Sequence, residues 1–142
     1  MKVVIFAGGF GSRLGRLTET TPKPMIKLLK MPIICHIMKY YSYYGYNDFL
    51  ILSGYKSKVI EKYFRTNKKI FTSVKNKKWK INVVYTGLNT MTGGRLKRVE
   101  NILKNEENFF LTYGDGLSNV NLNRQLNFHK TKKKIATVLG VH

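Results

Sequence analysis

Hydrophobic residues in this chain gather in short runs that alternate with stretches in which they recur every three or four positions. Short apolar runs that end in glycine or polar residues are typical of buried strands in a parallel sheet. The sequence therefore predicts strands at 3–7, 49–52, 81–85, 109–113 and 135–139.

Helical spacing separates these runs. The clearest helix is predicted at 33–44, where Pro32 suits the first turn and Gly45 suits the end. Further helices are predicted at 57–64, 94–103 and 122–128, with a loop at 65–80. Strands that alternate with helices indicate an α/β fold with a mainly parallel sheet, in which ligands bind beyond the carboxyl ends of the strands.

The length of 142 residues fits one domain, spanning 1–142. The chain stops directly after the last predicted strand, so we expect this domain to be incomplete. Cys35 is the single cysteine and cannot form an internal disulfide, and no apolar run reaches the ~18 residues of a membrane span. We therefore expect a cytoplasmic protein that makes no membrane contact.

The net charge is high, because 26 Lys and Arg residues against 7 Asp and Glu give +19. A basic surface can bind nucleic acid by releasing counterions from phosphates. The lysines, however, are scattered along the chain, without an arginine-rich or aromatic-interleaved recognition segment. We therefore favour a solvated lysine-rich surface over a nucleic-acid-binding domain; a positive field also suits polyphosphate ligands.

A glycine-rich loop, Gly-Gly-Phe-Gly-Ser-Arg-Leu at 8–14, follows the first predicted strand. Glycines let backbone N–H groups approach a phosphate, and Arg13 can grip phosphate oxygens in two places. The loop lacks the Gly-Lys-Ser/Thr of a P-loop, and Gly15 comes one residue too late for a dinucleotide fingerprint. An ordinary glycine turn between a strand and a helix is the alternative.

Lys23 follows ten residues after Arg13 and stands between Pro22 and Pro24. The two prolines stiffen the backbone and disfavour a helix there. A lysine held in this way is a pre-positioned positive charge, whereas a proline-stiffened surface loop is the alternative.

Together, Ala-Gly-Gly-x-Gly-x-Arg-Leu at 7–14 and Pro-Lys-Pro-Met at 22–25 resemble the signature of the sugar nucleotidyltransferases, the enzymes that make nucleotide-sugars. Met-Thr-Gly-Gly-Arg-Leu-Lys-Arg at 91–98 and Phe-Leu-Thr-Tyr-Gly-Asp-Gly at 110–116 resemble the glucose-1-phosphate cytidylyltransferase branch. The resemblance extends over 1–142. It implies a Rossmann-like nucleotidyltransferase fold that ends after its nucleotide-binding half, and a homo-oligomer in the complete protein.

The resemblance also implies the site residues. Arg13 and Lys23 would be catalytic, and Asp115 would bind Mg²⁺ together with a second aspartate from the later half of family members. The implied nucleotide-binding residues are Phe6, Ala7, Gly8, Gly9, Phe10, Gly11, Ser12, Arg13, Lys23, Thr90, Thr92, Gly93, Gly94 and Arg95.

The segment 92–94 follows a predicted strand and opens a helix. Its backbone and hydroxyl can therefore contact the polar edge of a base, while the helix N-terminus favours anions. Thr90 and Arg95 flank this turn, and Arg95 is a candidate for the ribose or the phosphates. A helix-capping turn with a solvent-facing arginine is the alternative.

The chain has only two aspartates. Asp48 precedes a predicted strand and is interpreted as a surface turn residue. Asp115 ends a predicted strand between two glycines, where a hard oxygen ligand suits Mg²⁺ bound jointly with nucleotide phosphates.

The implied reaction is cytidylyl transfer from CTP to glucose 1-phosphate, giving CDP-glucose and pyrophosphate for nucleotide-sugar and surface-polysaccharide biosynthesis. Such catalysis depends on positioning and charge neutralisation and needs no covalent enzyme intermediate. Two alternatives stay open: a nucleotide-binding fragment that catalyses nothing and, less favoured, a basic nucleic-acid-binding domain.

Overall fold

Four parallel strands form the central sheet of the computed structural model, which describes residues 1–66 and 78–140 without the side chain of Arg13. The strands, in the order β5-β4-β1-β6, are β1 (Lys2–Ala7), β4 (Asp48–Ser53), β5 (Lys80–Tyr85) and β6 (Phe110–Tyr113). Each coincides with a predicted apolar run, which confirms the α/β fold. Most of the loop predicted at 65–80 lies outside the described residues.

All four strands end at the same edge of the sheet. Ala7 pairs with Ser53 of β4, and Ser53 pairs in turn with Tyr85 of β5. On the other side of β1, Phe6 pairs with Tyr113 of β6. The chain moves outward from β1 to β4 and β5 and then returns to the opposite side of β1. The crevice between β1 and β6 is therefore a topological switch point, where ligands bind in sheets of this kind.

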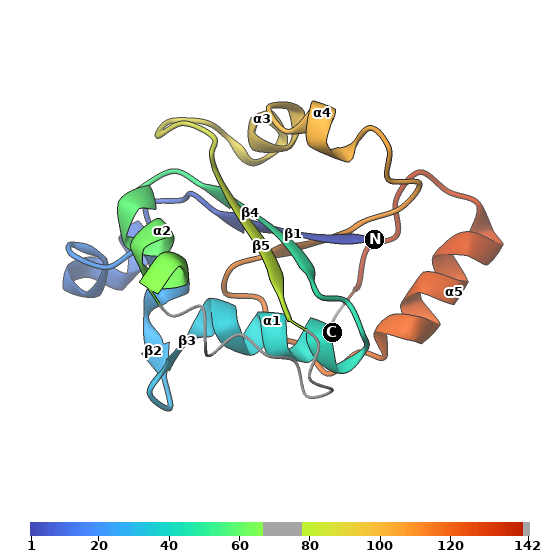
Figure 1. The fold of residues 1–142 in the computed structure, drawn as a ribbon, viewed down its shortest axis with the longest axis horizontal. Coiled ribbons are helices and arrows are strands. Elements are labelled where there is room, and N and C mark those ends of the chain that lie inside the picture. Colours follow the sequence, from blue (N-terminus) through green and yellow to red (C-terminus); the bar gives the residue numbers. More distant parts are fainter. Residues whose placement is uncertain (67–77, 141–142) are drawn as a thin grey trace.

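Helices cover both faces of the sheet, with α1 below it and α3 and α4 above it in Figure 1. The helices are α1 (Ile33–Tyr43), α2 (Ser57–Thr66), α3 (Thr92–Lys97) and α4 (Glu100–Leu103). One hydrophobic cluster joins α1 and α2 to one face, and a second joins α3 and α4 to the other. Because β1 and β4 are covered on both faces, most of their residues are buried, which explains their continuous apolar sequences.

The helix predicted at 94–103 is in fact two helices. Val99, between α3 and α4, has φ and ψ of −111° and 14°, which are not helical values. Leu96, Val99 and Leu103 nevertheless all pack in the cluster on that face of the sheet. The hydrophobic spacing continues across the break, so the sequence pattern could not reveal it.

Four short elements connect β1 to α1. They are η1 (Ser12–Thr18), η2 (Lys23–Met25), β2 (Lys27–Leu28) and β3 (Met31–Pro32). Gly11 and Gly15 have positive φ of 69° and 53°, a conformation that other residues rarely adopt. The prolines around Lys23 permit a single three-residue 3₁₀ turn and no α-helix, as their positions predict.

The helix predicted at 122–128 is confirmed as α5 (Leu122–Lys132). Asn121 caps it by accepting a hydrogen bond from the backbone N–H of Arg124 (3.1 Å). In Figure 1, α5 lies to one side of the sheet. Tyr46, in the segment between α1 and β4, connects to α5 by donating a hydrogen bond to Asn123 (3.0 Å).

The strand predicted at 135–139 is wrong. This segment pairs with no strand among the described residues, and Ile135 and Val138 are 105% and 87% exposed. A strand needs a neighbouring strand for its backbone hydrogen bonds, and an apolar sequence alone does not provide one. Residues 137–140 instead face α5 across an open groove of about 460 Å³.

Lys2 joins the start of β1 to two acidic residues. Its ammonium lies 3.2 Å from the carboxylate of Asp48 and 2.8 Å from that of Glu106. Asp48 is thus the first residue of β4 and an ion-pair partner, which corrects its interpretation as a turn residue. The hydrogen bond from Lys2 holds the pKa of Glu106 below its ordinary value of 4.5.

Glu106→Gln is expected to make the free energy of unfolding depend less steeply on pH in acid. A carboxyl group with a depressed pKa in the folded state contributes stability above its unfolded pKa, and loses that contribution as the pH falls through the folded pKa. The free energy of unfolding, measured with urea from about pH 6 down to about pH 3, should therefore fall less steeply in the variant. Glu107→Gln, at an exposed position, is the control. Equal slopes in Glu106→Gln and the wild type would contradict this expectation.

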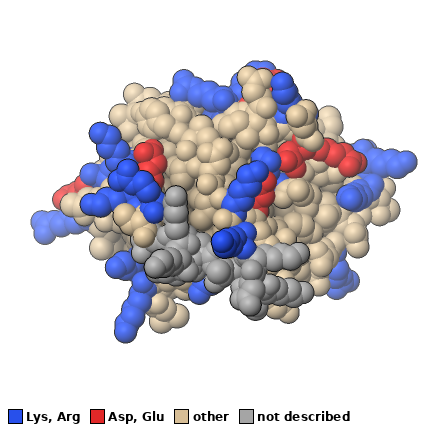
Figure 2. Space-filling view, viewed as in Figure 1, with Lys and Arg blue, Asp and Glu red and all other residues tan. Residues whose placement is uncertain are grey.

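Basic side chains are dispersed on the face of the molecule that Figure 2 shows. On the face shown in Figure 2 they occur over several elements, with acidic side chains among them. This dispersal agrees with the interpretation of a solvated lysine-rich surface. Among the described helices, none combines the length and the apolar character needed to cross a bilayer.

Candidate active site

Each strand of the sheet leads directly into a loop at the shared edge. The first residues after β1, β4, β5 and β6 are Gly8, Gly54, Thr86 and Gly114. Three of the four are glycines, and the loop backbones approach one another closely here. The N–H of Gly114 donates to the carbonyl of Phe6 (2.8 Å), and that of Thr86 donates to Ser53 (2.9 Å).

The glycine-rich loop lies beside Lys23. A Cβ at Gly11 would lie 2.9 Å from the methyl group of Thr18 and 3.2 Å from the Cβ of Lys23. The Thr18 hydroxyl donates to the carbonyl oxygens of Gly11 (3.3 Å) and Gly15 (3.0 Å). Thr18 thereby fixes the path of the loop and brings it against the proline-bracketed turn.

Lys23 forms an ion pair with Asp115 across the switch point between β1 and β6. Gly114 permits this approach, because a Cβ there would lie only 2.8 Å from the Cγ of Pro24. The side chains of Lys23 and Asp115 are 38% and 35% exposed, so a ligand can reach both. The structure therefore brings together the cation and the carboxylate that the sequence singled out separately.

Arg95 is buried, with 4% of its surface exposed, and its guanidinium binds the protein itself. The five hydrogen-bond acceptors are the carbonyl oxygens of Gly8, Ser53, Gly87 and Leu88 and the hydroxyl of Thr86, at 2.7 to 3.2 Å. The alternative of a solvent-facing arginine is therefore wrong. Arg95 hydrogen-bonds to the main chain of the loops that surround the site. Its expected contact with a nucleotide stays a prediction.

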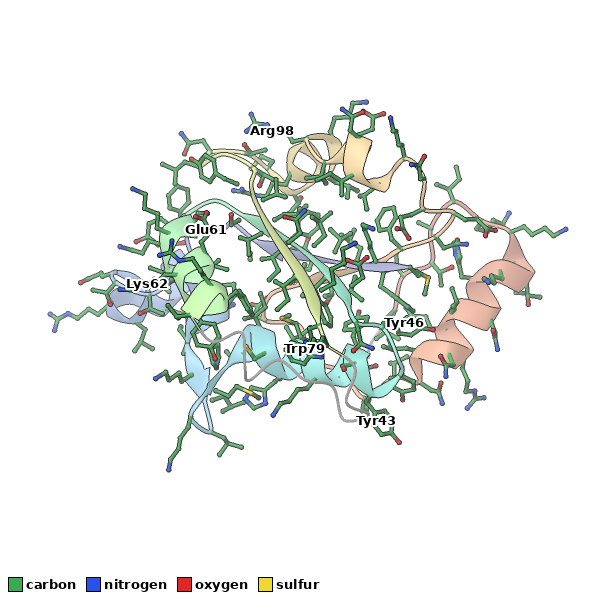
Figure 3. The ribbon with its side chains drawn as sticks, in the orientation of Figure 1. Tyr43, Tyr46, Glu61, Lys62, Trp79 and Arg98 are labelled. Carbon is green, nitrogen blue, oxygen red and sulfur yellow. The ribbon has the colours of Figure 1, made fainter. Side chains whose placement is uncertain are left out.

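A second arginine adds to the positive charge at this place. Arg98, labelled beside α3 in Figure 3, donates to the carbonyl of Thr86 (2.6 Å). Within the described residues, no ion pair involves Arg95 or Arg98. Burial, and then the charge of Arg98, lowers the pKa of Arg95. Two guanidinium groups without a carboxylate create a positive potential that favours an anionic ligand.

The predicted base-side turn lies at the start of α3. Residues 92–94 are exposed there. Thr90 packs close to this turn, since a Cβ at Gly94 would lie 3.0 Å from its methyl group and a Cβ at Gly87 would lie 2.5 Å from its hydroxyl. The turn is thus accessible, and it shares the loop after β5 with the contacts of Arg95.

The other predicted nucleotide-binding residues lie at the end of β1 and in the following loop. They are Phe6 and Ala7 in the strand, and Gly9, Phe10 and Ser12, which are exposed in the loop. The ring of Phe10 lies 5.3 Å from that of Tyr55, centroid to centroid. The side chain of Arg13 lies outside the described residues.

Three residues that shape this edge were missed at the level of sequence: Thr18, Gly54 and Arg98. Gly54 follows an apolar run in the same way as Gly8, Gly87 and Gly114. This shared position after a predicted strand could have identified Gly54 as part of the site from the sequence. Nothing in the sequence near Thr18 or Arg98 indicates their backbone partners.

The donor atoms at the switch point suit a metal that is shared with a ligand. The described residues contain no group of three His, Cys, Asp or Glu side chains able to hold a metal ion. Mg²⁺ bound through nucleotide phosphates, however, needs only one or two carboxylates from the protein. Asp115 fits the role of one such ligand.

Gly54→Ala is expected to lower the free energy of unfolding by about 1–3 kcal/mol. A Cβ at Gly54 would lie 2.7 Å from the carbonyl oxygens of both Gly8 and Gly87, and these backbone atoms cannot move without shifting the loops. Urea unfolding measures the effect. Gly93→Ala, whose Cβ would meet nothing within 4 Å, is the control. A Gly54→Ala variant as stable as the wild type would contradict the close packing described here.

Comparison with known proteins agrees with this geometry. A family model described as nucleotidyl transferase matches residues 2–142. The chain belongs to this family. The nucleotidyl transferase fold accounts for the parallel sheet, and the match extends over all of the strand-end loops described above.

Two relatives and one solved structure are similar to this chain. The glucose-1-phosphate cytidylyltransferase of Salmonella typhimurium is 41% identical over 152 residues, covering 97% of this chain and 59% of the relative. The mannose-1-phosphate guanyltransferase of Hypocrea jecorina is 30% identical over 142 residues, covering 98% of this chain and 37% of the relative. A crystal structure of UDP-glucose pyrophosphorylase complexed with UDP-glucose has a TM-score of 0.73 at 20% identity, covering 93% of this chain and 54% of that chain. At that identity the likeness shows the fold alone. The chain spans less than two thirds of each of these proteins.

Proposed function

We propose that this nucleotidyl transferase transfers a cytidylyl group from CTP to glucose 1-phosphate, giving CDP-glucose and pyrophosphate. The observation that carries the proposal is the meeting of the glycine-rich loop, Lys23 and Asp115 at the switch point of the sheet. The 41% identity to the Salmonella cytidylyltransferase supports the choice of base and sugar.

In the proposed reaction, a phosphate oxygen of glucose 1-phosphate attacks the α-phosphorus of CTP. The bond from that phosphorus to the oxygen bridging to the β-phosphate breaks, and pyrophosphate leaves with the electron pair. Proteins catalyse such transfers mainly by aligning the reactants and neutralising negative charge. The proposed mechanism therefore needs positioned N–H groups and cations more than a protein nucleophile.

The places of the residues support the proposed roles, except that of Arg13, which rests on the family resemblance. The backbone N–H groups of the loop 8–13 would bind the triphosphate, and Lys23 and Arg13 would neutralise charge at the reacting phosphates. Asp115 would hold Mg²⁺, which supplies further charge neutralisation when bound. Thr90 and the turn 92–94 would face the base. Ligand binding would separate Lys23 from Asp115, since each then gains a partner of opposite charge.

Further features of the whole protein stay proposals. The chain does not span one part of its relatives, and we infer that a corresponding region of the whole protein adds contacts to glucose 1-phosphate. We also infer that the complete protein is a homo-oligomer. A cytoplasmic location rests on the single cysteine, Cys35, which is buried and free. CDP-glucose made there would serve polysaccharide biosynthesis.

Pyrophosphate release tests the proposed function. The chain is incubated with glucose 1-phosphate, Mg²⁺ and CTP, UTP or dTTP in parallel. Turnover with CTP above that with UTP and dTTP is the expected result, and turnover only with UTP or dTTP would refute the assigned base. A second candidate, nucleotide binding without catalysis, is favoured by the coverage of only 59% of the Salmonella relative. It predicts CTP binding by a folded chain with no pyrophosphate released.

A further inference from the structure

Arg95 occupies the point where the loops after β1, β4 and β5 meet. Two glycines provide the space for its guanidinium. A Cβ at Gly8 would overlap the guanidinium carbon, and a Cβ at Gly54 would lie 2.5 Å from Nη1. Glycine at position 8 is thus explained by one side chain that lies far from it in the sequence, and the same side chain adds to the backbone contacts that require glycine at position 54.

The hydrogen-bond acceptors around this side chain suit a planar guanidinium group. Nη1 donates to the last residue of β4 and to two residues after β5, whereas Nη2 donates to Gly8 after β1 (2.9 Å) and to Leu88 after β5 (3.2 Å). Guanidinium spreads its donors over separate nitrogen atoms in one plane, but a lysine ammonium has all its donors on one atom. Lysine would therefore keep the charge and lose the connection between loops.

The carbonyl of Gly8 is the most important of these acceptors, because it begins the glycine-rich loop. It accepts hydrogen bonds from Arg95 (2.9 Å) and from the backbone N–H of Tyr55 (3.1 Å). Its position is therefore fixed from the Arg95 side and from the loop after β4. The peptide groups that follow it are the ones proposed to bind the triphosphate.

We propose that Arg95 is a positioning residue, which holds the phosphate-side loop after β1 and the base-side loop after β5 in one arrangement. It acts through the backbone carbonyls of the loops that would bind the ligand. The proposal rests on the proposed function for the identity of that ligand. It distinguishes Arg95 from Lys23, whose ammonium is accessible and would contact the phosphates directly.

The first test compares Arg95→Ala and Arg95→Lys with Arg124→Ala, a control at an exposed position on α5. Hydrogen exchange is measured without nucleotide, and CTP affinity is measured by calorimetry with Mg²⁺. Both Arg95 variants should exchange faster at 8–12 and 86–92 and bind CTP about tenfold more weakly or worse. Added methylguanidinium should restore the slow exchange and the affinity of Arg95→Ala. If Arg95→Ala does not fold, Arg95→Lys supplies the same measurements.

A double-mutant cycle provides a test that needs no nucleotide. Gly8→Ala should destabilise the wild type strongly, because the new methyl group overlaps the guanidinium. In the Arg95→Ala background the same change should have a much smaller effect on the urea midpoint, since the overlapping group is gone. Equal effects in both backgrounds would overturn the assignment.

The possible outcomes separate this proposal from the proposed function. Weaker CTP binding with unchanged exchange in both loops would make Arg95 a direct ligand contact and overturn its positioning role. Unchanged exchange and unchanged affinity would also overturn it. A wild-type chain that binds no CTP would refute the proposed function alone, because the exchange experiment and the cycle still decide the role of Arg95.

Discussion

Lys23→Ala is expected to weaken the binding of CTP with Mg²⁺ by about 10- to 100-fold, because a charge-assisted contact contributes about 1.5–3 kcal/mol. Pro22 and Pro24 hold the backbone of Lys23, and its side chain faces the glycine-rich loop and Asp115. Removing the ammonium leaves Asp115 to repel the incoming phosphates. Calorimetric titration of the variant with CTP measures the loss.

Two comparisons separate this binding effect from a folding effect. The ion pair of Lys23 with Asp115 is more than one-third exposed on both sides, so breaking it should hardly change the urea midpoint. Lys27→Ala removes an exposed lysine four positions later and should leave CTP affinity unchanged. If Lys27→Ala weakened binding as much as Lys23→Ala, general positive charge rather than a positioned cation would explain the affinity.

Phe49→Ala is expected to lower the free energy of unfolding by about 3–5 kcal/mol, the usual range for removing a buried phenyl ring. Phe49 is fully buried in β4 and packs edge to face against Trp79, with 5.4 Å between ring centroids. The indole N–H of Trp79, which is labelled beside α1 in Figure 3, donates to Ser42 of α1 (2.9 Å). The ring pair therefore connects the sheet to the α1 layer. The substitution opens a cavity at this connection.

Urea unfolding followed by circular dichroism measures this loss. Phe128→Ala makes the same chemical change on α5, where the ring is 54% exposed, and should alter stability by about 0.5 kcal/mol or less. Similar losses in both variants would contradict the packing of Phe49 in the main core.

The sheet could be predicted because β1 and β4 lie under helices on both faces, which requires continuous apolar sequence. The same reasoning failed at 135–139. Ile135 and Val138 have the composition of a strand, but a strand also needs a partner, and a single run of sequence does not show whether one is present. The break at Val99 was hidden for a different reason, because the residues on both sides of it face the same side of the sheet.

The site was predictable where one short segment carries its own chemistry. The glycine-rich loop and the prolines around Lys23 are such segments, and parallel strands with a common edge bring them together. The role of Arg95 was not predictable, because its acceptors come from Gly8, Ser53 and the loop after β5. Sequence position suggested a ligand-binding or solvent-facing side chain, whereas burial among backbone carbonyls depends on the assembled sheet.

We infer that a nucleoside triphosphate binds at the carboxyl ends of β1, β5 and β6. NMR spectra of the ¹⁵N-labelled chain, recorded while CTP is added with Mg²⁺, test this claim. We expect saturable shifts of the amides in 8–12, in 90–94 and at Asp115, with α5 unchanged. Shifts that avoid these loops, or that spread over the lysine-rich surface in proportion to CTP, would show general polyanion binding and contradict the claim.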